Sequence, residues 1–454
     1  MTSRDATPGN TVDARLRAAG LPPLPRTAWL EIDLDRLAGN VAAIRAGVPE
    51  AVVLEVVVKA DGYGHGAVPV AHAAVAAGAR GLCVATLDEA LELRRAGISA
   101  PVLVLFQVPP DGAPVAARAG VAIAAGDAGL LEEAIAAYGA ARRRARGSLP
   151  DLGVQLAIET GLGRDGLTTE EAVVAGRLIA ASPGVALRGA WSHLQAPPDR
   201  ARTDAQVERF SAAVDALREA GFEIPHRHIL ASGGLLGVER LVGGERLVGG
   251  ERPVFDGLRV GLAAYGIVPD GLAIGSAAAG IHDGLRPVLS LHARPIRVAD
   301  LPAGTGISYG PSFVTARPSR IATLPLGYAD GWVRTLSNRA TALVRGHRTP
   351  LVGNVAMDAV MADVTDVPGP PVTPADEFVL LGAQGGEEIT AAELAQERTT
   401  ITWEVVATMS RRLPRVYTSR AVTVGIRTLT EERGRWRSLR SGTATSATSR
   451  LTRS

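Results

Sequence analysis

Residues 53–66 read VLEVVVKADGYGHG, an apolar run that ends in a lysine and leads into a glycine-rich loop. The run VLEVVVK (53–59) is short and rich in β-branched residues, which is typical of a strand buried in a parallel sheet. Lys59 therefore ends a predicted strand, and glycine alternates with other residues after it. Because glycine accepts conformations that other residues avoid, such a loop can bring the backbone close to a ligand.

The same alternation continues from about residue 52 to 260, where short apolar runs are separated by longer amphipathic segments such as 87–96 and 204–219. Alternating strands and helices predict an α/β fold, and eight strands predict a (β/α)8 TIM barrel. In such barrels the chemistry lies at the C-terminal ends of the strands, and phosphate often binds in the loops after strands seven and eight. Those loops begin with ASGG (231–234) and VGLA (260–263). The eight candidate strands are 53–59, 81–85, 102–106, 121–124, 153–158, 187–192, 227–231 and 257–260.

The pattern changes after about residue 281, where β-rich, turn-punctuated segments such as LSLHARPIRV, RIATLPL, ATALVRG and EFVLLG follow one another. We therefore divide the chain into a barrel over 28–280 and a C-terminal, mainly β domain over 281–428. The ends, 1–27 and 429–454, are polar or basic, and we expect both to be disordered. The hexapeptide ERLVGG occurs at 239–244 and again at 245–250, which we interpret as a local duplication in a surface loop.

Charge and composition exclude several classes of protein. The formal net charge is +2, but the segment 433–454 holds six arginines and no acid, so the rest of the chain carries about −4. This distribution argues against nucleic-acid binding. No apolar run reaches the length of a spanning helix and no signal-peptide pattern opens the chain, so we expect a cytoplasmic protein that does not bind membranes. The single cysteine, Cys83, lies in an apolar run and is interpreted as a core thiol.

Lys59 is the only lysine among 48 basic residues, and the other 47 are arginine. A coding bias toward arginine explains the 47 arginines, but it does not explain the position of the single lysine. Arginine cannot replace a lysine that must lose its proton and form an imine, because the guanidinium stays protonated and is a poor nucleophile. At the end of the first barrel strand, Lys59 is therefore predicted to be a catalytic amine. Two main classes of enzyme that use such a lysine remain, the lysine aldolases and the enzymes that depend on pyridoxal 5′-phosphate (PLP).

The segment KADGYGHG (59–66) closely resembles the cofactor-lysine motif of the alanine racemases, which are PLP-dependent enzymes of fold type III. The resemblance extends from WLEIDLDRLAGNV (29–41) to SRRLPRVY (410–417). Its other motifs are TGLGR (160–164), WSHLQ (191–195), LRVGLAAYG (258–266), ISYG (307–310), GYADG (327–331) and NVAMD (354–358).

The resemblance implies an isomerase that interconverts L- and D-alanine, a step that supplies D-alanine for peptidoglycan precursors. Racemisation removes the Cα proton from one face and returns a proton to the other, which two bases on opposite sides of the cofactor can do. By resemblance, these bases are Lys59, which carries PLP as a Schiff base, and Tyr309. Tyr309 would reach the barrel of a partner subunit, so that a head-to-tail homodimer shares its active sites.

The resemblance also assigns the residues around the cofactor and substrate, with no metal among them. Arg259 is aimed at the pyridine nitrogen, where a guanidinium donates a hydrogen bond without yielding a proton and keeps the electron sink weak. Arg164 would hold the substrate carboxylate, a task that suits its planar fork, and Met357 would line the substrate pocket. The remaining cofactor-binding residues are Tyr63, Ser232, Gly261 and Leu262 at the phosphate and His193 against the ring.

Four positions depart from the family pattern. Ala157 replaces a lysine, often carbamylated, that braces the substrate-binding arginine, so we expect chloride or Glu159 to hold Arg164 instead. Ala231 and Ala356 replace larger residues and should enlarge the pocket, whereas Trp403 replaces a tyrosine near the substrate entrance.

These departures leave three alternatives open. The chain is a racemase of serine or another small amino acid, including one that serves secondary metabolism; a fold-type III decarboxylase; or a non-catalytic PLP-binding protein. A decarboxylase typically has an acid at the ring nitrogen where this chain has Arg259, and the non-catalytic barrels lack the β domain and Tyr309.

Overall fold

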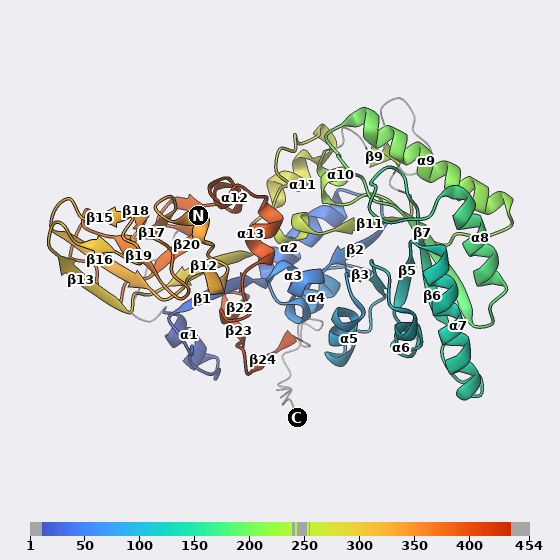
Figure 1. Ribbon diagram of the computed structural model, residues 1–454, viewed down its shortest axis with the longest axis horizontal. Helices are drawn as coiled ribbons and strands as arrows, with labels where there is room; N and C mark the ends of the chain where they lie inside the picture. The colour runs from blue at the N-terminus through green and yellow to red at the C-terminus, as the bar shows by residue number, and fades with distance from the viewer. Residues whose placement is uncertain (1–10, 238–240, 243–251, 254, 437–454) are drawn as a thin grey trace. The chain divides into compact units, whose positions relative to one another are not determined.

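The computed structural model describes residues 11–237, 241–242, 252–253 and 255–436, and these residues form two compact units (Figure 1). The first unit comprises residues 37–62 and 67–286, and the second comprises 11–36, 63–66 and 287–436. Most of the ERLVGG duplication and the basic tail beyond residue 436 lie outside the described residues.

Eight parallel strands close into a barrel in the first unit, which confirms the predicted architecture. Strands of this kind are buried on both faces, which explains their continuous apolar character. The seventh strand is much shorter than predicted, because only Arg227 and His228 join the ladder and a single pair, Gly257 with His228, links it to the eighth. The barrel strands are β2 (Val53–Val57), β3 (Gly81–Val84), β4 (Val102–Val104), β5 (Ala122–Ala125), β6 (Leu152–Ala157), β7 (Val185–Trp191), β8 (Arg227–His228) and β11 (Gly257–Val260).

Helices follow the barrel strands, and α7, α8 and α9 begin with a side-chain cap from Asp127, Thr168 and Asp199. Thr168 accepts a hydrogen bond from the amide of Glu171, whose carboxylate accepts one in return from the amide of Thr168, a reciprocal capping box. The helices of this unit are α2 (Leu34–Ala46), α3 (Lys59–Tyr63), α4 (Ala67–Ala76), α5 (Leu87–Arg95), α6 (Ala113–Arg118), α7 (Ala128–Arg144), α8 (Thr169–Ala180), α9 (Arg200–Glu219), α10 (Ser232–Leu236) and α11 (Ala279–Gly284), although α2 and α3 cross the boundary between the units. Among the described residues, no helix combines the length and the apolar character that crossing a membrane requires.

The second unit is built on a twelve-stranded sheet, as the β-rich segments after residue 281 predicted. An early strand, β1, lies inside this sheet, where it pairs antiparallel with β12 and parallel with β22. Two short helices, α12 (Ala391–Arg398) and α13 (Thr402–Ala407), follow β21. The strands of the sheet are β1 (Ala28–Asp33), β12 (Leu289–Ala293), β13 (Arg297–Leu301), β16 (Ser319–Leu324), β17 (Thr341–Val344), β18 (His347–Val352), β19 (Val360–Asp363), β20 (Phe378–Gln384), β21 (Glu387–Ile389), β22 (Arg415–Ser419), β23 (Val422–Arg427) and β24 (Glu432–Gly434), and a separate hairpin pairs β14 (Gly306–Ile307) with β15 (Phe313–Val314).

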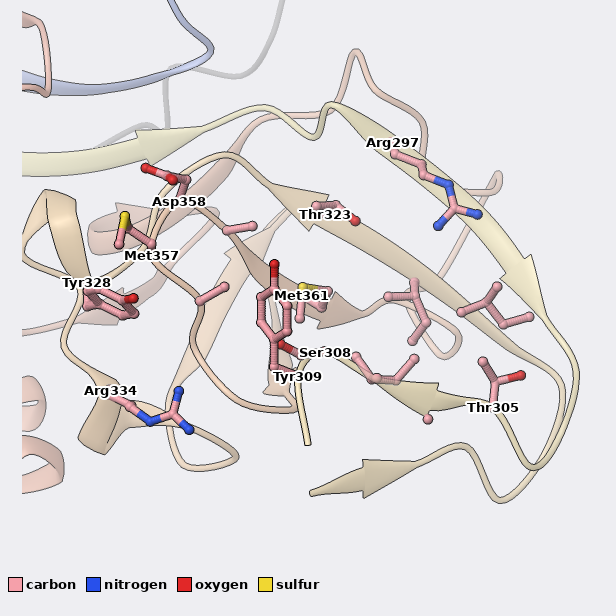
Figure 2. A pocket seen from close by; sticks show the side chains of 16 residues that line it. Arg297, Thr305, Ser308, Tyr309, Thr323, Tyr328, Arg334, Met357, Asp358 and Met361 are labelled. Atoms are coloured by element: carbon pink, nitrogen blue, oxygen red, sulfur yellow. The ribbon is translucent and has the colours of Figure 1, made fainter. Parts of the chain in front are cut away.

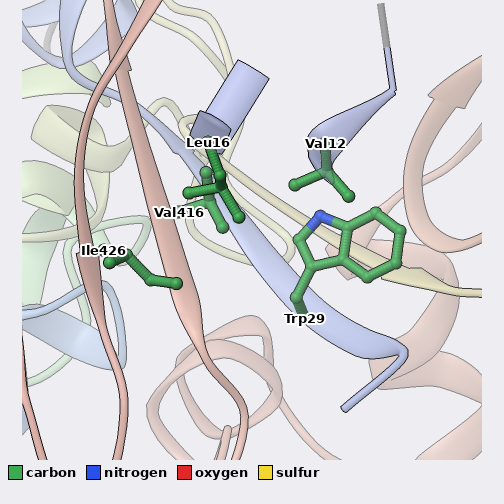
Figure 3. Packing of buried hydrophobic residues seen from close by; sticks show 5 residues of the cluster. All are labelled: Val12, Leu16, Trp29, Val416 and Ile426. Carbon is green, nitrogen blue, oxygen red and sulfur yellow. The ribbon is translucent and has the colours of Figure 1, made fainter. Parts of the chain in front are cut away.

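Our prediction of disordered ends was wrong for their described parts. In the tail predicted over 429–454, residues 432–434 form β24, which pairs with β23, and the leader predicted over 1–27 contains a helix. Residues 12–18 form helix α1 (Val12–Ala18), whose N-terminus is capped by the Thr11 hydroxyl. Figure 3 shows Val12 of this helix near the Trp29 ring and Leu16 near Val416, and Ile426 completes the buried cluster. The low overall hydropathy of the leader concealed these two apolar residues, which are spaced four apart on one helix face.

Truncating the buried contact of α1 should destabilise the second unit. Leu16→Ala removes a side chain with no exposed surface, so we expect the free energy of unfolding to fall by about 2–4 kcal/mol. Denaturant unfolding of the full chain measures the change, with the exposed Arg17→Ala as the matched control. Equal stability of the two variants would show that α1 does not contribute to the fold.

Candidate active site

Lys59 follows the first barrel strand and opens an unusual backbone segment. Ala60, Asp61, Gly62 and Tyr63 all have left-handed backbone angles, with φ between 51° and 62°. A non-glycine residue in this conformation costs about 1–2 kcal/mol, so three of the four carry strain that surrounding contacts must offset.

Glu89 supplies one of those contacts. Its carboxylate accepts hydrogen bonds from the amide of Ala60, at 2.7 Å, and from the amides of Ala85 and Thr86 at the start of α5. Glu89 was not among the predicted site residues, although a threonine followed three residues later by a glutamate is a capping signal that the sequence contains. The carboxylate thus links the turn after Lys59 to the next strand–helix connection.

The amine of Lys59 lies in an environment that disfavours its charge. Burial lowers the pKa of Lys59 below its ordinary value, and the guanidinium of Arg164 and, less strongly, that of Arg259 lower the pKa further, while Glu89 acts in the opposite direction. A lowered pKa raises the fraction of neutral amine, which is the form that attacks a carbonyl.

Arg259 lies in the eighth barrel strand and is almost completely buried. Its guanidinium donates to Nδ1 of His228 at 2.5 Å and to the carbonyl of Ser192 at 2.6 Å, and it stacks on the Trp191 ring at 4.8 Å. Because a guanidinium carries no acceptor and stays protonated, Nδ1 of His228 must be the acceptor. These contacts hold Arg259 in one orientation, and His228 is a second site residue that we did not predict.

His193 follows the sixth barrel strand, near three cationic side chains. Burial lowers the pKa of His193 to about 3, and the charges of Arg259, Arg164 and Lys59 act in the same direction. The imidazole is therefore neutral near pH 7.

The two loops predicted to bind phosphate meet at Ser232. Its hydroxyl oxygen accepts hydrogen bonds from the amides of Gly261, at 3.0 Å, and Ala263, at 3.2 Å, and Leu262 between them is fully buried. Backbone amides and a hydroxyl converge here without a bulky side chain, which is the donor set that a phosphate group needs.

The partner of Arg164 differs from our expectation. Glu159 accepts hydrogen bonds from the amides of Gly161 and Gly163, and Arg164 pairs instead with Asp165, with 2.8 Å between Nε and Oδ1. The guanidinium also lies over the ring of Phe106, at 5.0 Å from its centre. Because Asp165 contacts Nε, the side of the guanidinium opposite Nε points away from the Asp165 carboxylate. The adjacent acid in GRDG was the available signal, and Glu159 was the wrong choice.

Tyr309 belongs to the second unit, where it is one of the most exposed large side chains, with 76% of its surface accessible. Ser308 and Gly310 on either side have positive φ, and the Asn354 amide donates to the carbonyls of Tyr309 and Gly310. The loop thus presents the phenol outward from a braced backbone.

Tyr309 is one of the residues that line a pocket of about 890 Å³ in the second unit. Figure 2 shows Tyr309, Met357, Tyr328 and Arg334 among the side chains that line it. Ala356, one of the four departures from the family pattern, also lines this pocket. The predicted substrate-pocket residue Met357 and the predicted base Tyr309 are therefore brought together.

The predicted residues thus fall into two groups. The barrel unit holds Lys59, Arg164, His193, Ser232, Arg259, Gly261 and Leu262, all at or beyond the C-terminal ends of its strands. The second unit holds Tyr309, Met357 and Tyr63, the last within the inserted segment 63–66. Of the other departures, Ala157 ends β6, Ala231 precedes α10 and Trp403 lies in α13.

Comparison with known proteins agrees with this division. Residues 32–269 match the family model for the N-terminal domain of alanine racemase, and residues 288–417 match the model for its C-terminal domain. The chain is 42% identical over 395 residues to the alanine racemase of Symbiobacterium thermophilum, which covers 86% of this chain and 97% of that protein. The chain belongs to the alanine racemase family.

Solved structures of this family have the same fold. The crystal structure of alanine racemase from Bacillus anthracis with bound L-Ala-P superimposes with a TM-score of 0.78 at 34% identity, covering 90% of this chain and 99% of that one. The enzyme from D-cycloserine-producing Streptomyces lavendulae gives a TM-score of 0.74 at 33% identity, covering 87% and 98% of the two chains.

Alanine racemases depend on PLP, and the barrel unit of this chain fits that cofactor. Lys59 offers an amine of lowered pKa, and Arg259 offers a buried guanidinium fixed by neutral acceptors. The hydroxyl of Ser232 and the amides of Gly261 and Ala263, which donate to it in this structure, are the groups that a bound phosphate would engage.

Removing the carboxylate beside Arg164 should weaken substrate binding. Asp165→Asn deletes the charge of a partly exposed pair, so we expect KM to rise by about five-fold, equivalent to about 1 kcal/mol, with a smaller change in kcat. Steady-state kinetics measure the effect, and Glu170→Gln, an exposed acid on α8, is the matched control. A change confined to kcat would contradict this role.

The lowered pKa of His193 makes the fold sensitive to acid. The unfolded chain binds a proton at its ordinary pKa of 6.5 and the folded chain only at about 3, so stability is lost as the pH falls through this window, by about 1.4 kcal/mol per pH unit at most. We expect His193→Asn to lose stability less steeply than the unmodified chain between pH 6.5 and 4.5. Parallel slopes in denaturant titrations at several pH values would count against this account.

Proposed function

We propose that this protein racemises alanine with PLP, using Lys59 and Tyr309 as the two proton-transferring bases. The observation that carries the proposal is that the sole lysine of the chain stands at a barrel-strand end, with its pKa lowered, in the unit that also holds the fixed guanidinium of Arg259. When bound, PLP supplies the electron sink that makes the Cα proton of an amino acid removable.

Each base has a separate task in this proposal. The Nζ atom of Lys59 takes the Cα proton of the D isomer, and the phenolic oxygen of Tyr309 takes that of the L isomer. Arg164 binds the substrate carboxylate with the edge of its guanidinium that Asp165 leaves available. Arg259 would face the ring nitrogen of a bound PLP, where its guanidinium would donate a hydrogen bond without losing its proton and so keep the ring a weak electron sink.

The active unit is proposed to be a homodimer whose subunits share their sites. Support comes from the exposure of Tyr309, since a catalytic side chain that is 76% accessible in one chain needs a partner to enclose it. We further propose a cytoplasmic enzyme that supplies D-alanine for peptidoglycan precursors, in line with the relatives named alanine racemase.

A substrate panel tests the reaction. Purified protein with PLP should invert L-alanine, and Lys59→Ala and Tyr309→Phe should each lower kcat/KM for alanine by about 10²–10⁴-fold. Borohydride treatment should fix the cofactor to Lys59 in the unmodified protein and leave the Lys59→Ala protein unlabelled. Faster inversion of serine, which the small side chain of Ala356 in the pocket would favour, would replace alanine as the substrate. Release of carbon dioxide without inversion would contradict the proposal.

Mixing the two inactive variants tests the shared site. If Lys59 and Tyr309 of one site come from different subunits, an equal mixture of Lys59→Ala and Tyr309→Phe should recover about one quarter of the activity, because half of the dimers are mixed and each has one intact site. Failure to recover activity after demonstrated subunit exchange would place both bases on one chain.

A further inference from the structure

The interior of the barrel contains a layer of polar side chains below Lys59. The layer consists of Glu55 of β2, Gln155 of β6, His226 directly before β8, His228 of β8 and Arg259 of β11, whereas barrel interiors are usually filled with branched apolar residues. Glycine makes room for the layer. A Cβ at Gly257 would lie 2.3 Å from Cε1 of His226, and one at Gly81 would lie 3.2 Å from Cγ of Glu55.

The hydrogen bonds of this layer define the protonation of His228. Arg259 donates to Nδ1, so the proton is on Nε2, which donates to Oε1 of Gln155 at 2.7 Å. Burial lowers the pKa of His228 well below its ordinary range, with Arg259 as the next cause. His228 is therefore neutral and cannot balance the charge of Arg259.

The remaining contacts of Arg259 are also neutral, since they are the carbonyls of Ser192 and His228 and the Trp191 ring. Two acidic groups favour its charged form, Cys83 and Glu55, but burial raises the pKa of Cys83 so far that the thiol stays protonated. A buried guanidinium without an opposite charge is strongly destabilising. Glu55, itself 6% exposed and with Oε2 at 3.4 Å from Nδ1 of His228, is the carboxylate placed to balance it.

We propose that Glu55 is a positioning residue: its carboxylate is the buried counter-charge of Arg259, and the attraction between the two charges helps to hold the guanidinium in its functional orientation. His226, with Nε2 at 3.5 Å from the same carboxylate oxygen, closes the layer on its other side. This role of Glu55 rests on the proposed function, because the orientation of Arg259 matters for a bound PLP ring.

A divalent metal ion is the competing occupant of this layer. The ligand atoms of Glu55, His226 and His228 lie within 4.8 Å of one another. However, the lone pair of Nδ1 on His228 is already engaged by Arg259, and a dication would face that guanidinium with one carboxylate to balance three positive charges. The charge count favours Glu55 as the partner of Arg259.

A double-mutant cycle on the full-length protein tests the pairing. Glu55→Gln should lower the apparent melting temperature by about 4 °C or more in the unmodified chain. In the Arg259→Gln background the same change should have no effect or raise the melting temperature, because Glu55 is then the unbalanced charge. Glu31→Gln, which removes a carboxylate paired with Arg15 in the second unit, should act equally in both backgrounds. Equal effects of Glu55→Gln in both backgrounds would overturn the proposal.

Two further readouts separate a positioning role from a purely structural one. Glu55→Gln should change the visible absorption band of bound PLP, and Glu55→Asp should restore it in part, whereas the Arg259→Gln protein should show no additional change. Melting curves with added Zn²⁺ test the metal: stabilisation of the unmodified chain that disappears in both Glu55→Gln and His226→Asn would overturn the pairing in favour of a metal site. The melting-temperature cycle needs no catalysis, so a protein that keeps the coupling but racemises nothing would contradict the proposed function alone.

Discussion

The charge of Arg259 is the constraint around which the barrel interior is organised. A guanidinium cannot give up its proton to escape burial, so every neighbour must accept a hydrogen bond or supply negative charge. The short seventh strand provides His228, the sixth provides the carbonyl of Ser192, and the first provides Glu55. Glycines at two ladder positions keep the space that these larger side chains need. The polar residues and the glycines of this interior layer are thus explained by one buried charge, that of Arg259.

The same charge has an effect on the amine of Lys59. Arg164 and Arg259 both lower the pKa of this lysine, and Glu89 partly offsets them while it holds the strained turn that follows. Three strained non-glycine residues, with left-handed backbone conformations, thus lie within four residues after Lys59, the group that must be oriented most accurately. These contacts orient the side chains of the site in the ligand-free chain, which is the arrangement that limits the reorganisation cost of catalysis.

The sequence predicted the fold well because the fold depends on periodicity. The eight apolar runs, their order and the change to a β-rich pattern after residue 281 all correspond to observed elements. The candidate catalytic and binding residues were chosen by motif, and the contacts that support them in the structure were not predicted. Asp165 was overlooked in favour of Glu159, since both acids are near Arg164 in sequence and only the backbone direction of the loop decides between them. Glu55 was counted as part of an apolar strand, because linear order does not reveal which strand stands opposite a buried arginine.

Strand β1 has a consequence for how the protein is made. Its neighbours in the sheet, β12 and β22, lie more than 250 residues further along the chain. A ribosome therefore releases β1 and α1 long before their partners exist, and the complete barrel emerges in between. During that interval both edges of β1 lack their partner strands, because β12 and β22 have not yet been synthesised. An unpaired strand edge can pair with other chains, so this early strand is exposed to aggregation until residues 289–293 and 415–419 emerge.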